Sequence, residues 1–262
     1  MKKPLVIKIG GAILDHQEQN KDAGLIALLN VIASLKDQAV VIVHGGGCVV
    51  DEMLAQAGFT TEKKDGLRIT PQEQMPVISG ALAGNVNKSI VAAANAMGLQ
   101  AVGIALNDGD MVKCNLNDKN LGAVGIPVAK NSKLLDALIS AHFIPVISSI
   151  GALENGELVN VNADDAAVAV CQLLNAELLL LTDVNGVKDA SGKYLESLNH
   201  QEANLLIEQG VIAGGMTAKV NAALHAAQQL RRSIAVASWQ LPEQIISLLD
   251  GKDIGTRIQF KH

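Results

Sequence analysis

Short apolar runs alternate along the chain with longer segments whose apolar residues recur at helical spacing. Most of the short runs are apolar on both faces, which is typical of strands in the centre of a parallel sheet. The predicted strands are Leu5–Ile9, Ala39–Val43, Ala101–Leu106, Phe143–Ile147, Glu177–Leu181 and Ile234–Ala237. The predicted helices are Ala23–Leu35, Val49–Ala57, Pro71–Met97, Lys133–Ala141, Asp164–Leu174, Gln201–Gln209 and Thr217–Leu230.

This alternation predicts an α/β protein with an open, mostly parallel central sheet and right-handed crossovers. Two stretches, Val112–Val128 and Ala152–Val161, have glycines at or beside turn positions and predict β-hairpins, which would form a flap or rim beside the sheet. Ligands of open parallel sheets bind outside the carboxyl ends of the strands. The residues that follow each strand are therefore the first candidates for a functional site.

Composition narrows the class of protein. Of the 262 residues, 49% are hydrophobic and only 2% are aromatic, so a large core must be built from aliphatic side chains. The formal net charge is −5, and neither a basic patch nor aromatic residues for base stacking favour nucleic acid as a partner. The three cysteines are far apart and form no Cys-x-x-Cys pair, which indicates reduced thiols in the cytoplasm.

No membrane or targeting segment is predicted. The apolar run after the basic N-terminal residues is too short for a signal-peptide core, and Lys8 interrupts it. Residues Ser89–Asn107 carry no charge, but Asn95, Gly98 and Gln100 favour a helix end, a turn and a strand instead of a membrane span.

A lysine lies in the first predicted strand. Desolvating a cation there is costly unless an anion is near, and Gly10 and Gly11 would let backbone N–H groups approach a phosphate. From this segment alone, a Lys8 side chain that simply reaches solvent from the strand end is equally well supported.

The second predicted strand ends in three glycines, Gly45–Gly47, and a helical pattern follows. Free amides and a helix N-terminus together favour an anion. The alternative is a tight strand–helix turn, which rarely needs three glycines. His44 precedes them and is better suited to holding the loop by a hydrogen bond than to acting as a base.

Two further segments place polar residues near strand or helix ends. Arg68 precedes Pro71 and offers a fork that matches a carboxylate, although a surface arginine is the more common reading of such a segment. Asn160 and Asn162 alternate with valines, so both point to one face of a strand end, and Asp164 follows them. Either Asn162 or Asp164 could be only the N-cap of the next helix.

Two segments in the last third resemble nucleotide-binding elements. The strand Leu178–Leu181 ends in a polar turn that could be a nucleotide loop or an ordinary β-turn. Lys219 lies near the start of a helix, where the dipole disfavours a cation unless an anion lies beside it. No Walker motif, no G-x-G-x-x-G after the first strand, no Ser–His–Asp set and no metal-ligand set is present.

The strings KIGG, VHGGG, DGLRIT, LVNVNAD, LLLLTDVNGV and GGMTAKV, in this order, resemble the amino acid kinase family from residue 4 to about 258. The first two alone would also fit members that act on carbamate, glutamate or uridylate. The combination of G-L-R-x-T, N-V-N-A-D and G-G-M-x-x-K is similar to members that phosphorylate N-acetyl-L-glutamate.

The resemblance implies a three-layer α/β/α sandwich in one domain, residues 1–262. It further implies an acceptor-binding lobe over about 1–175 and a nucleotide-binding lobe over 176–262. The implied reaction transfers the γ-phosphoryl group of ATP to the γ-carboxylate of N-acetyl-L-glutamate in arginine biosynthesis, with Mg²⁺ bound mainly through ATP. The alternatives are a sister kinase for carbamate or glutamate, and a non-catalytic binding protein that keeps the fold.

The resemblance also assigns roles to residues. Lys8 and Lys219 would stabilise the transition state, and Asp164 would orient both lysines. Gly46, Gly47, Arg68, Asn160 and Asn162 would hold the acceptor. The nucleotide and its phosphates would contact Gly10, Gly11, Asp183, Val184, Asn185, Gly186, Val187, Lys188, Val211, Ile212 and Ala213.

The resemblance finally bears on assembly. Arginine-inhibited members of the family have an extra N-terminal helix that links dimers into a hexamer. Because the first strand is predicted to begin at about Leu5, no room is left for that helix. We therefore expect a homodimer that is insensitive to arginine and is joined through the region Pro71–Met97.

Overall fold

The computed structural model describes residues 2–10, 13, 21–64, 66–249, 252 and 255–260. Within these residues the main sheet has eight strands in the order β12-β14-β13-β11-β1-β2-β8-β5, and every neighbouring pair except β13–β14 is parallel. The strands are β12 (Ser197–Leu198), β14 (Thr256–Ile258), β13 (Ile234–Ser238), β11 (Glu177–Thr182), β1 (Leu5–Ile9), β2 (Val40–His44), β8 (Ile144–Ser148) and β5 (Ala101–Ala105). The prediction of a mostly parallel sheet is confirmed.

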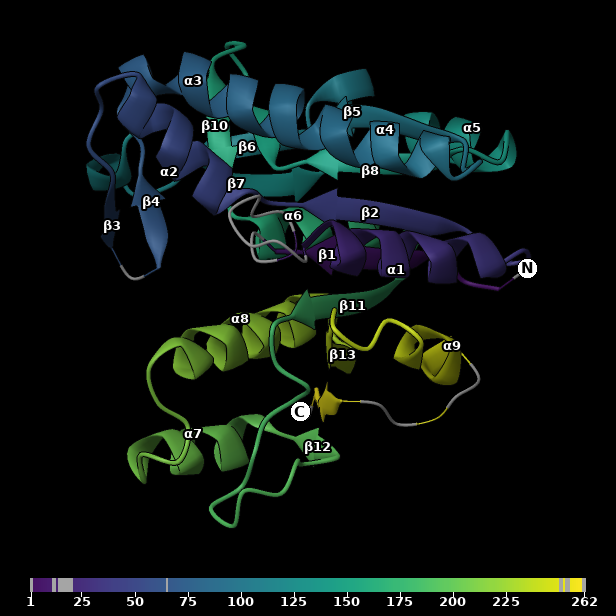
Figure 1. The fold of residues 1–262 in the computed structure, drawn as a ribbon. Helices are drawn as coiled ribbons and strands as arrows, with labels where there is room; N and C mark the ends of the chain where they lie inside the picture. The colour runs from purple at the N-terminus through teal and green to yellow at the C-terminus, as the bar shows by residue number, and fades with distance from the viewer. Residues whose placement is uncertain are drawn as a thin grey trace.

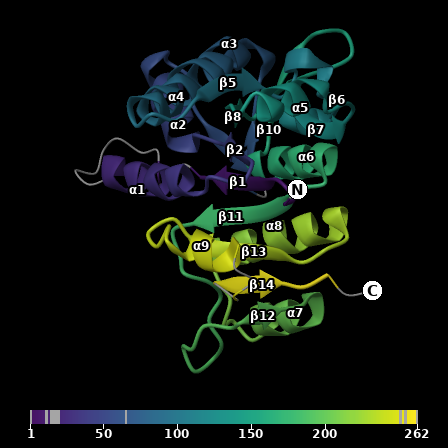
Figure 2. The same cartoon turned by 90° about the vertical axis from the view of Figure 1, so that its right-hand side faces the viewer.

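Helices cover both faces of this sheet and make a three-layer sandwich. Figure 2 shows α1 (Lys21–Ser34) and α9 (Gln244–Leu249) on one side of the central strands, and α6 (Ala163–Leu174) and α8 (Gly215–Leu230) on the other. Two separate apolar clusters fill the two gaps between layers. The alternation of side chains along β1 separates them: Leu5, Ile7 and Ile9 belong to the cluster on the α1 side, and Val6 belongs to the cluster on the α6 side.

The remaining helices lie around this sandwich (Figure 1). They are α2 (Gly47–Gln56), α5 (Lys133–Ser140) and α7 (His200–Glu208). The long helix predicted over Pro71–Met97 is a single path with changing geometry: a 3₁₀ turn at Gln72–Gln74, α3 (Met75–Ser79), a π-helical segment η3 (Gly80–Val86) and α4 (Asn87–Ala96).

The two predicted hairpins are confirmed, and they join into a second sheet. Its order is β6-β7-β10-β9, with β6 (Val112–Leu116), β7 (Val124–Ala129), β10 (Leu158–Val161) and β9 (Ile150–Ala152). Pairs β6–β7 and β9–β10 are antiparallel, whereas β7–β10 is parallel. A further hairpin, β3 (Glu62–Lys64) with β4 (Leu67–Ile69), was not predicted, because its strands are short, and β3 is polar and exposed.

The uncharged stretch Ser89–Asn107 divides as its sequence predicts. Helix α4 ends at Ala96, and β5 begins at Ala101. Among the helices of the described residues, none is long and apolar enough to cross a membrane.

Replacing Gly125 in β7 by alanine tests how tightly the strands of the second sheet pack. A Cβ there would lie 2.5 Å from Val159 Cγ2 and 3.0 Å from Cys114 Cβ, so Gly125→Ala must push two neighbouring strands apart. We expect a loss of about 1–3 kcal/mol in the free energy of unfolding, measured by urea denaturation. The control Val128→Thr, at an exposed position of the same strand, should change it by less than about 0.5 kcal/mol. Equal stability of Gly125→Ala and the native chain would contradict this packing.

Candidate functional site

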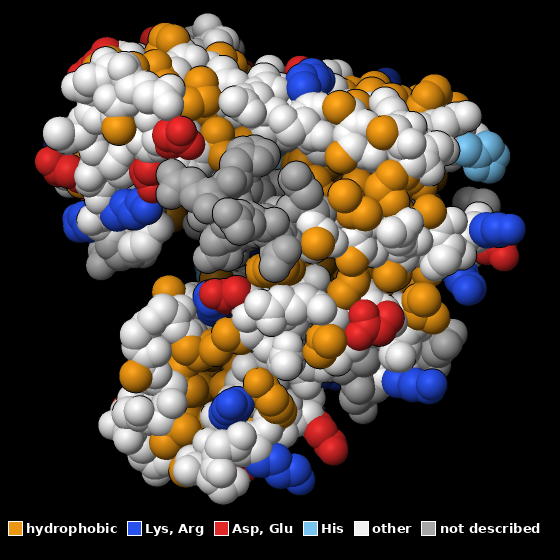
Figure 3. Space-filling model, in the orientation of Figure 1, with side chains coloured by type: hydrophobic (Ala, Val, Ile, Leu, Met, Phe, Trp, Pro, Cys, Tyr) orange, Lys and Arg blue, Asp and Glu red, His pale blue; other side chains and the backbone are white. Residues whose placement is uncertain are grey.

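Three neighbouring central strands, β11, β1 and β2, are parallel and end at the same edge of the main sheet. A hydrogen bond of 3.2 Å from Gly45 N to Ile9 O ties the loop after β2 to the end of β1. Figure 3 shows a hollow at this edge, between the upper part with the β3–β4 hairpin and the lower part with α8. The predicted site residues gather on its two sides.

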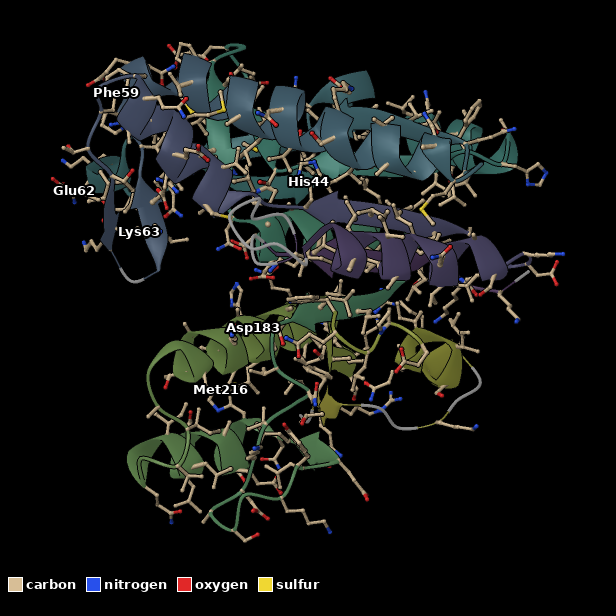
Figure 4. The ribbon with its side chains drawn as sticks, viewed as in Figure 1. His44, Phe59, Glu62, Lys63, Asp183 and Met216 are labelled. Atoms are coloured by element: carbon tan, nitrogen blue, oxygen red, sulfur yellow. The ribbon has the colours of Figure 1, made fainter. Side chains whose placement is uncertain are left out.

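On the upper side lies a cavity of about 250 Å³. It is lined by all five residues predicted to hold an acceptor, Gly46, Gly47, Arg68, Asn160 and Asn162. The sequence analysis missed Lys63 and Ser149, which also line it. Lys63 comes from the unpredicted β3–β4 hairpin (Figure 4), and Ser149 lies directly after β8, at a strand end that carried no motif.

Arg68 is a fixed part of this cavity. Its Nη1 donates to Asp51 Oδ1 at 2.5 Å and to Thr61 Oγ1 at 3.2 Å, and its Nη2 donates to Gly47 O at 3.2 Å. Its side chain is only 8% exposed, so the reading of Arg68 as an ordinary surface residue is wrong. Partial burial raises the pKa of Asp51, but the Arg68 guanidinium and the Lys63 ammonium together hold it below its usual value.

The two asparagines have different local roles. Asn160 in β10 donates from Nδ2 to Thr70 Oγ1 at 3.3 Å. Asn162 is the N-cap of α6, and its Oδ1 accepts from Asp164 N at 2.8 Å and from Asp165 N at 3.4 Å. Because Asn162 supplies the cap, the carboxylate of Asp164 is available for another partner.

That partner is Lys8. Its Nζ lies 2.8 Å from Asp164 Oδ1, and both side chains are mostly buried. Lys8 lies on the same face of β1 as Val6, which faces α6, so the geometry of the sheet brings the two charges together. Gly10 is adjacent, since a Cβ on it would lie 3.8 Å from Lys8 Nζ. Gly11, the other predicted phosphate contact, lies outside the described residues.

The lower side of the hollow carries the second predicted catalytic lysine. Lys219, in the second turn of α8, forms a hydrogen-bonded ion pair with Asp183, which follows β11. This hydrogen bond holds the pKa of Asp183 below its usual value. Each lysine therefore pairs with a carboxylate of its own: Lys8 with Asp164, and Lys219 with Asp183. The resemblance, in contrast, assigns Asp164 the role of orienting both lysines.

The other predicted nucleotide residues fall into two groups. Val184, Gly186, Val187 and Lys219 line a small cavity of about 10 Å³, together with Met216, which the sequence analysis missed. The remaining predicted residues are not part of its lining: Asn185, Lys188, Val211, Ile212 and Ala213. Of these, Lys188 lies over the Tyr194 ring, 4.9 Å from its centre, and Ile212 O accepts from Thr217 Oγ1 at 3.3 Å.

His44 is fully buried beneath the glycine loop. Burial lowers its pKa from 6.5 to about 4, the hydrogen bond to Gly45 O raises it in part, and the Lys88 charge lowers it further. A fully buried histidine with a pKa far below 7 is out of reach of a substrate and too weakly basic to suit a general base, which agrees with the predicted structural role.

No cluster of three or more metal-ligating side chains occurs within the part of the chain that the structure describes. The two carboxylates nearest the lysines, those of Asp164 and Asp183, are both engaged in ion pairs.

Two lysines and glycine-rich strand ends on either side of one hollow define a protein that handles anions at the edge of an α/β sheet. Residues 3–238 match the model of the amino acid kinase family, and the chain belongs to that family.

Relatives of known function lie close in sequence. Acetylglutamate kinase of Colwellia psychrerythraea strain 34H is 74% identical over 257 residues, which cover 98% of this chain and 97% of the relative. Acetylglutamate kinase of Aeromonas salmonicida strain A449 is 45% identical over 260 residues, with 98% of each chain covered. Among solved structures, smu.665 of Streptococcus mutans UA159 superposes with a TM-score of 0.80 at 26% identity, and each chain is covered completely.

The buried His44 predicts a dependence of stability on pH. Below pH 6.5 the unfolded chain binds a proton at this residue, whereas the folded chain does not until about pH 4. The His44 contribution to the free energy of unfolding should therefore fall by roughly 3 kcal/mol as the pH drops through this window, at about 1.4 kcal/mol per pH unit.

Urea denaturation of the native chain and of His44→Asn between pH 7 and pH 4 isolates this contribution. The variant should have a shallower dependence on pH, whereas His142→Asn, at an exposed position, should match the native chain. Parallel curves for the native chain and His44→Asn would show that His44 binds its proton equally well in both states.

Proposed function

We propose that this protein is an acetylglutamate kinase, which transfers the γ-phosphoryl group of ATP to the γ-carboxylate of N-acetyl-L-glutamate. The product is N-acetyl-L-glutamyl 5-phosphate, in arginine biosynthesis. The observation that carries the proposal is the acceptor cavity, where Arg68 and the glycine loop lie on one wall close to the end of β1. The 74% identity to an acetylglutamate kinase supports the same acceptor.

The cavity suits a small dianion with an amide group. Arg68 has five N–H donors, and its three hydrogen bonds to Asp51, Thr61 and Gly47 leave donors for a substrate carboxylate. The Asn160 amide can donate and accept, as recognition of an acetamido group requires. Gly46 and Gly47 bring backbone N–H groups to the same wall.

The reaction needs alignment and charge neutralisation more than proton transfer. A γ-carboxylate has an unperturbed pKa of about 4.3 and is already a nucleophile at neutral pH. In the proposed mechanism, Asp164 orients Lys8 against the transferring phosphoryl group, and Lys219 approaches the same group from the nucleotide side. Fixed positive charge of this kind stabilises the spreading negative charge of the transition state.

We further propose that residues 1–175 form the acceptor lobe and residues 176–262 the nucleotide lobe. ATP would lie against Asp183–Lys188 and Val211–Ala213, with its phosphates toward Gly10 and Gly11. The cavity lined by Val184, Gly186, Val187 and Met216 holds only about 10 Å³, about the space of one water, so a nucleotide that entered it would displace side chains such as Met216. Mg²⁺ would enter with ATP as part of the substrate.

The lysine assignment has a direct kinetic test. Lys8→Ala and Lys219→Ala should each lower kcat by about 10²-fold or more, because each removes a charge that acts in the transition state. Arg68→Lys should instead raise the KM for the acceptor by about tenfold, since lysine cannot form the fork. A coupled assay of ADP release, run with N-acetylglutamate, glutamate and carbamate, measures all three variants.

The control for this series is Lys36→Ala, an exposed lysine that should leave both constants unchanged. Full activity of either lysine variant would remove that lysine from the mechanism. Faster turnover with carbamate or glutamate than with N-acetylglutamate would move the protein to a sister kinase.

We also propose a cytoplasmic homodimer that arginine does not inhibit. Two cysteines, Cys114 and Cys171, are buried thiols, which suits a reducing compartment. The helical path from Gln72 to Ala96 packs one side on the core and exposes the other, so it offers a surface for a second copy of the chain.

Light scattering coupled to size-exclusion chromatography should give a mass of two chains, each of 27.3 kDa. Activity measured with saturating substrates should not change when arginine is added. A hexamer, a monomer or clear inhibition by arginine would each contradict the proposal.

A further inference from the structure

Asn87 is a fully buried polar residue that the proposed reaction does not use. It is the first residue of α4, directly after the π-helical segment Gly80–Val86. Burying an amide costs free energy unless its donors and acceptors are satisfied. The hydrogen-bond partners of Asn87 therefore indicate which groups this residue holds in place.

These partners come from several elements around the glycine loop. Asn87 Nδ2 lies 3.0 Å from His44 Nε2 and 2.9 Å from Val146 O, and its Oδ1 accepts from Lys88 Nζ at 3.2 Å. Gly103 in β5 leaves room for this side chain, because a Cβ there would lie 2.0 Å from Asn87 Oδ1. A glycine inside a strand usually weakens it, and the space that Asn87 needs explains Gly103 in the edge strand β5.

The contacts of Asn87 select one form of the histidine. Val146 O, and Ile104 O at 3.5 Å, can only accept, so the atom that faces them is the amide NH₂ of Asn87. An amide nitrogen donates and does not accept, so it donates to His44 Nε2 at 3.0 Å. Nε2 then accepts and carries no proton. The ring proton lies on Nδ1, which donates to Gly45 O at 2.8 Å.

The direction of Gly45 O decides where the next amide points. In a trans peptide the C=O of one residue and the N–H of the next point in opposite directions. With Gly45 O held by the buried ring, Gly46 N–H is directed away from the ring. Gly46 lines the acceptor cavity, and within the described residues its N–H has no acceptor from the protein.

The π-helical segment contacts the same peptide. A Cβ on Gly46 would lie 3.0 Å from Leu82 Cδ2 and 3.0 Å from Val86 Cγ2, so the helix packs against the bare backbone of the loop. Since each helical residue turns by about 100°, removing one residue from this wide turn would rotate Asn87 away from His44. The π-helical segment therefore has two effects: it packs Leu82 and Val86 against Gly46, and it orients Asn87 so that its amide meets His44.

We propose that Asn87 and His44 are positioning residues, which hold the Gly45–Gly46 peptide so that Gly46 N–H donates to an anionic oxygen of the acceptor. Asn87 fixes the Nδ1–H tautomer of His44, and His44 fixes Gly45 O. This inference rests on the proposed acetylglutamate kinase reaction and adds to it the groups that set the acceptor site.

A matched pair of substitutions separates positioning from simple packing. Asn places a side-chain N–H near the position of Nδ1, whereas Gln reaches the position of Nε2 and leaves Gly45 O without its donor. Both substitutions leave similar space in the core. We expect His44→Gln to raise the KM for N-acetylglutamate by about tenfold, with the KM for ATP unchanged, and His44→Asn to restore most of the loss.

Two-bond ¹H–¹⁵N spectra of the native protein test the tautomer without any activity measurement. They should show His44 protonated at Nδ1 only, and Asn87→Leu should lose this signature while raising the KM for the acceptor as His44→Gln does. Thermal unfolding of each variant confirms that it is folded under assay conditions.

Protonation at Nε2 in the native protein, equal losses in the Asn and Gln variants, or matching rises in both KM values would each overturn the proposal. These outcomes are distinct from failure of the proposed function, in which the native protein itself would not phosphorylate N-acetylglutamate.

Discussion

The ion pair between Lys8 and Asp164 is the interaction on which the site depends. A lysine on a central strand of a parallel sheet is stable only where an anion meets it, because the surrounding aliphatic side chains offer no solvation. Helix α6 brings Asp164 to that position, since Asn162 caps the helix and leaves the carboxylate of Asp164 unengaged by the cap. The same pair joins β1 to α6, so the Lys8 charge that we propose acts on the phosphoryl group is anchored between two elements of the core.

The remaining charges of the site are arranged in the same way. Arg68 is held by Asp51 in the acceptor cavity, and Lys219 is held by Asp183 on the nucleotide side. Each cation is thus oriented by a carboxylate before any substrate is present, which reduces the reorganisation needed during reaction. The Lys219 pair is more exposed than the Lys8 pair, which suits the proposed role of Lys219 beside a phosphate of the nucleotide.

A glycine-rich loop alone does not determine where its amides point. In this protein the neutral ring of His44 binds Gly45 O, Asn87 binds the ring, and Leu82 with Val86 packs against Gly46. The loop is free of side chains on the substrate side and tightly constrained on the core side. This combination gives close approach to an anion without the entropy cost of ordering a flexible segment at each binding event.

From the sequence alone, the central strands of the main sheet, most of the helices and the strand ends around the hollow could be predicted, whereas the short strands β12 and β14 were missed. The apolar periodicity of a segment indicates its buried face, and the motif strings contain most of the polar residues that line the cavity at the sheet edge. The partner of each charge is visible only in the folded protein: the Asp164 carboxylate pairs with Lys8, Arg68 is buried against Asp51, and Asn87 enters the core beside His44. Such pairings join residues 17 to more than 150 positions apart. No local pattern encodes these pairings, because they arise when layers pack and a buried polar group must find a partner.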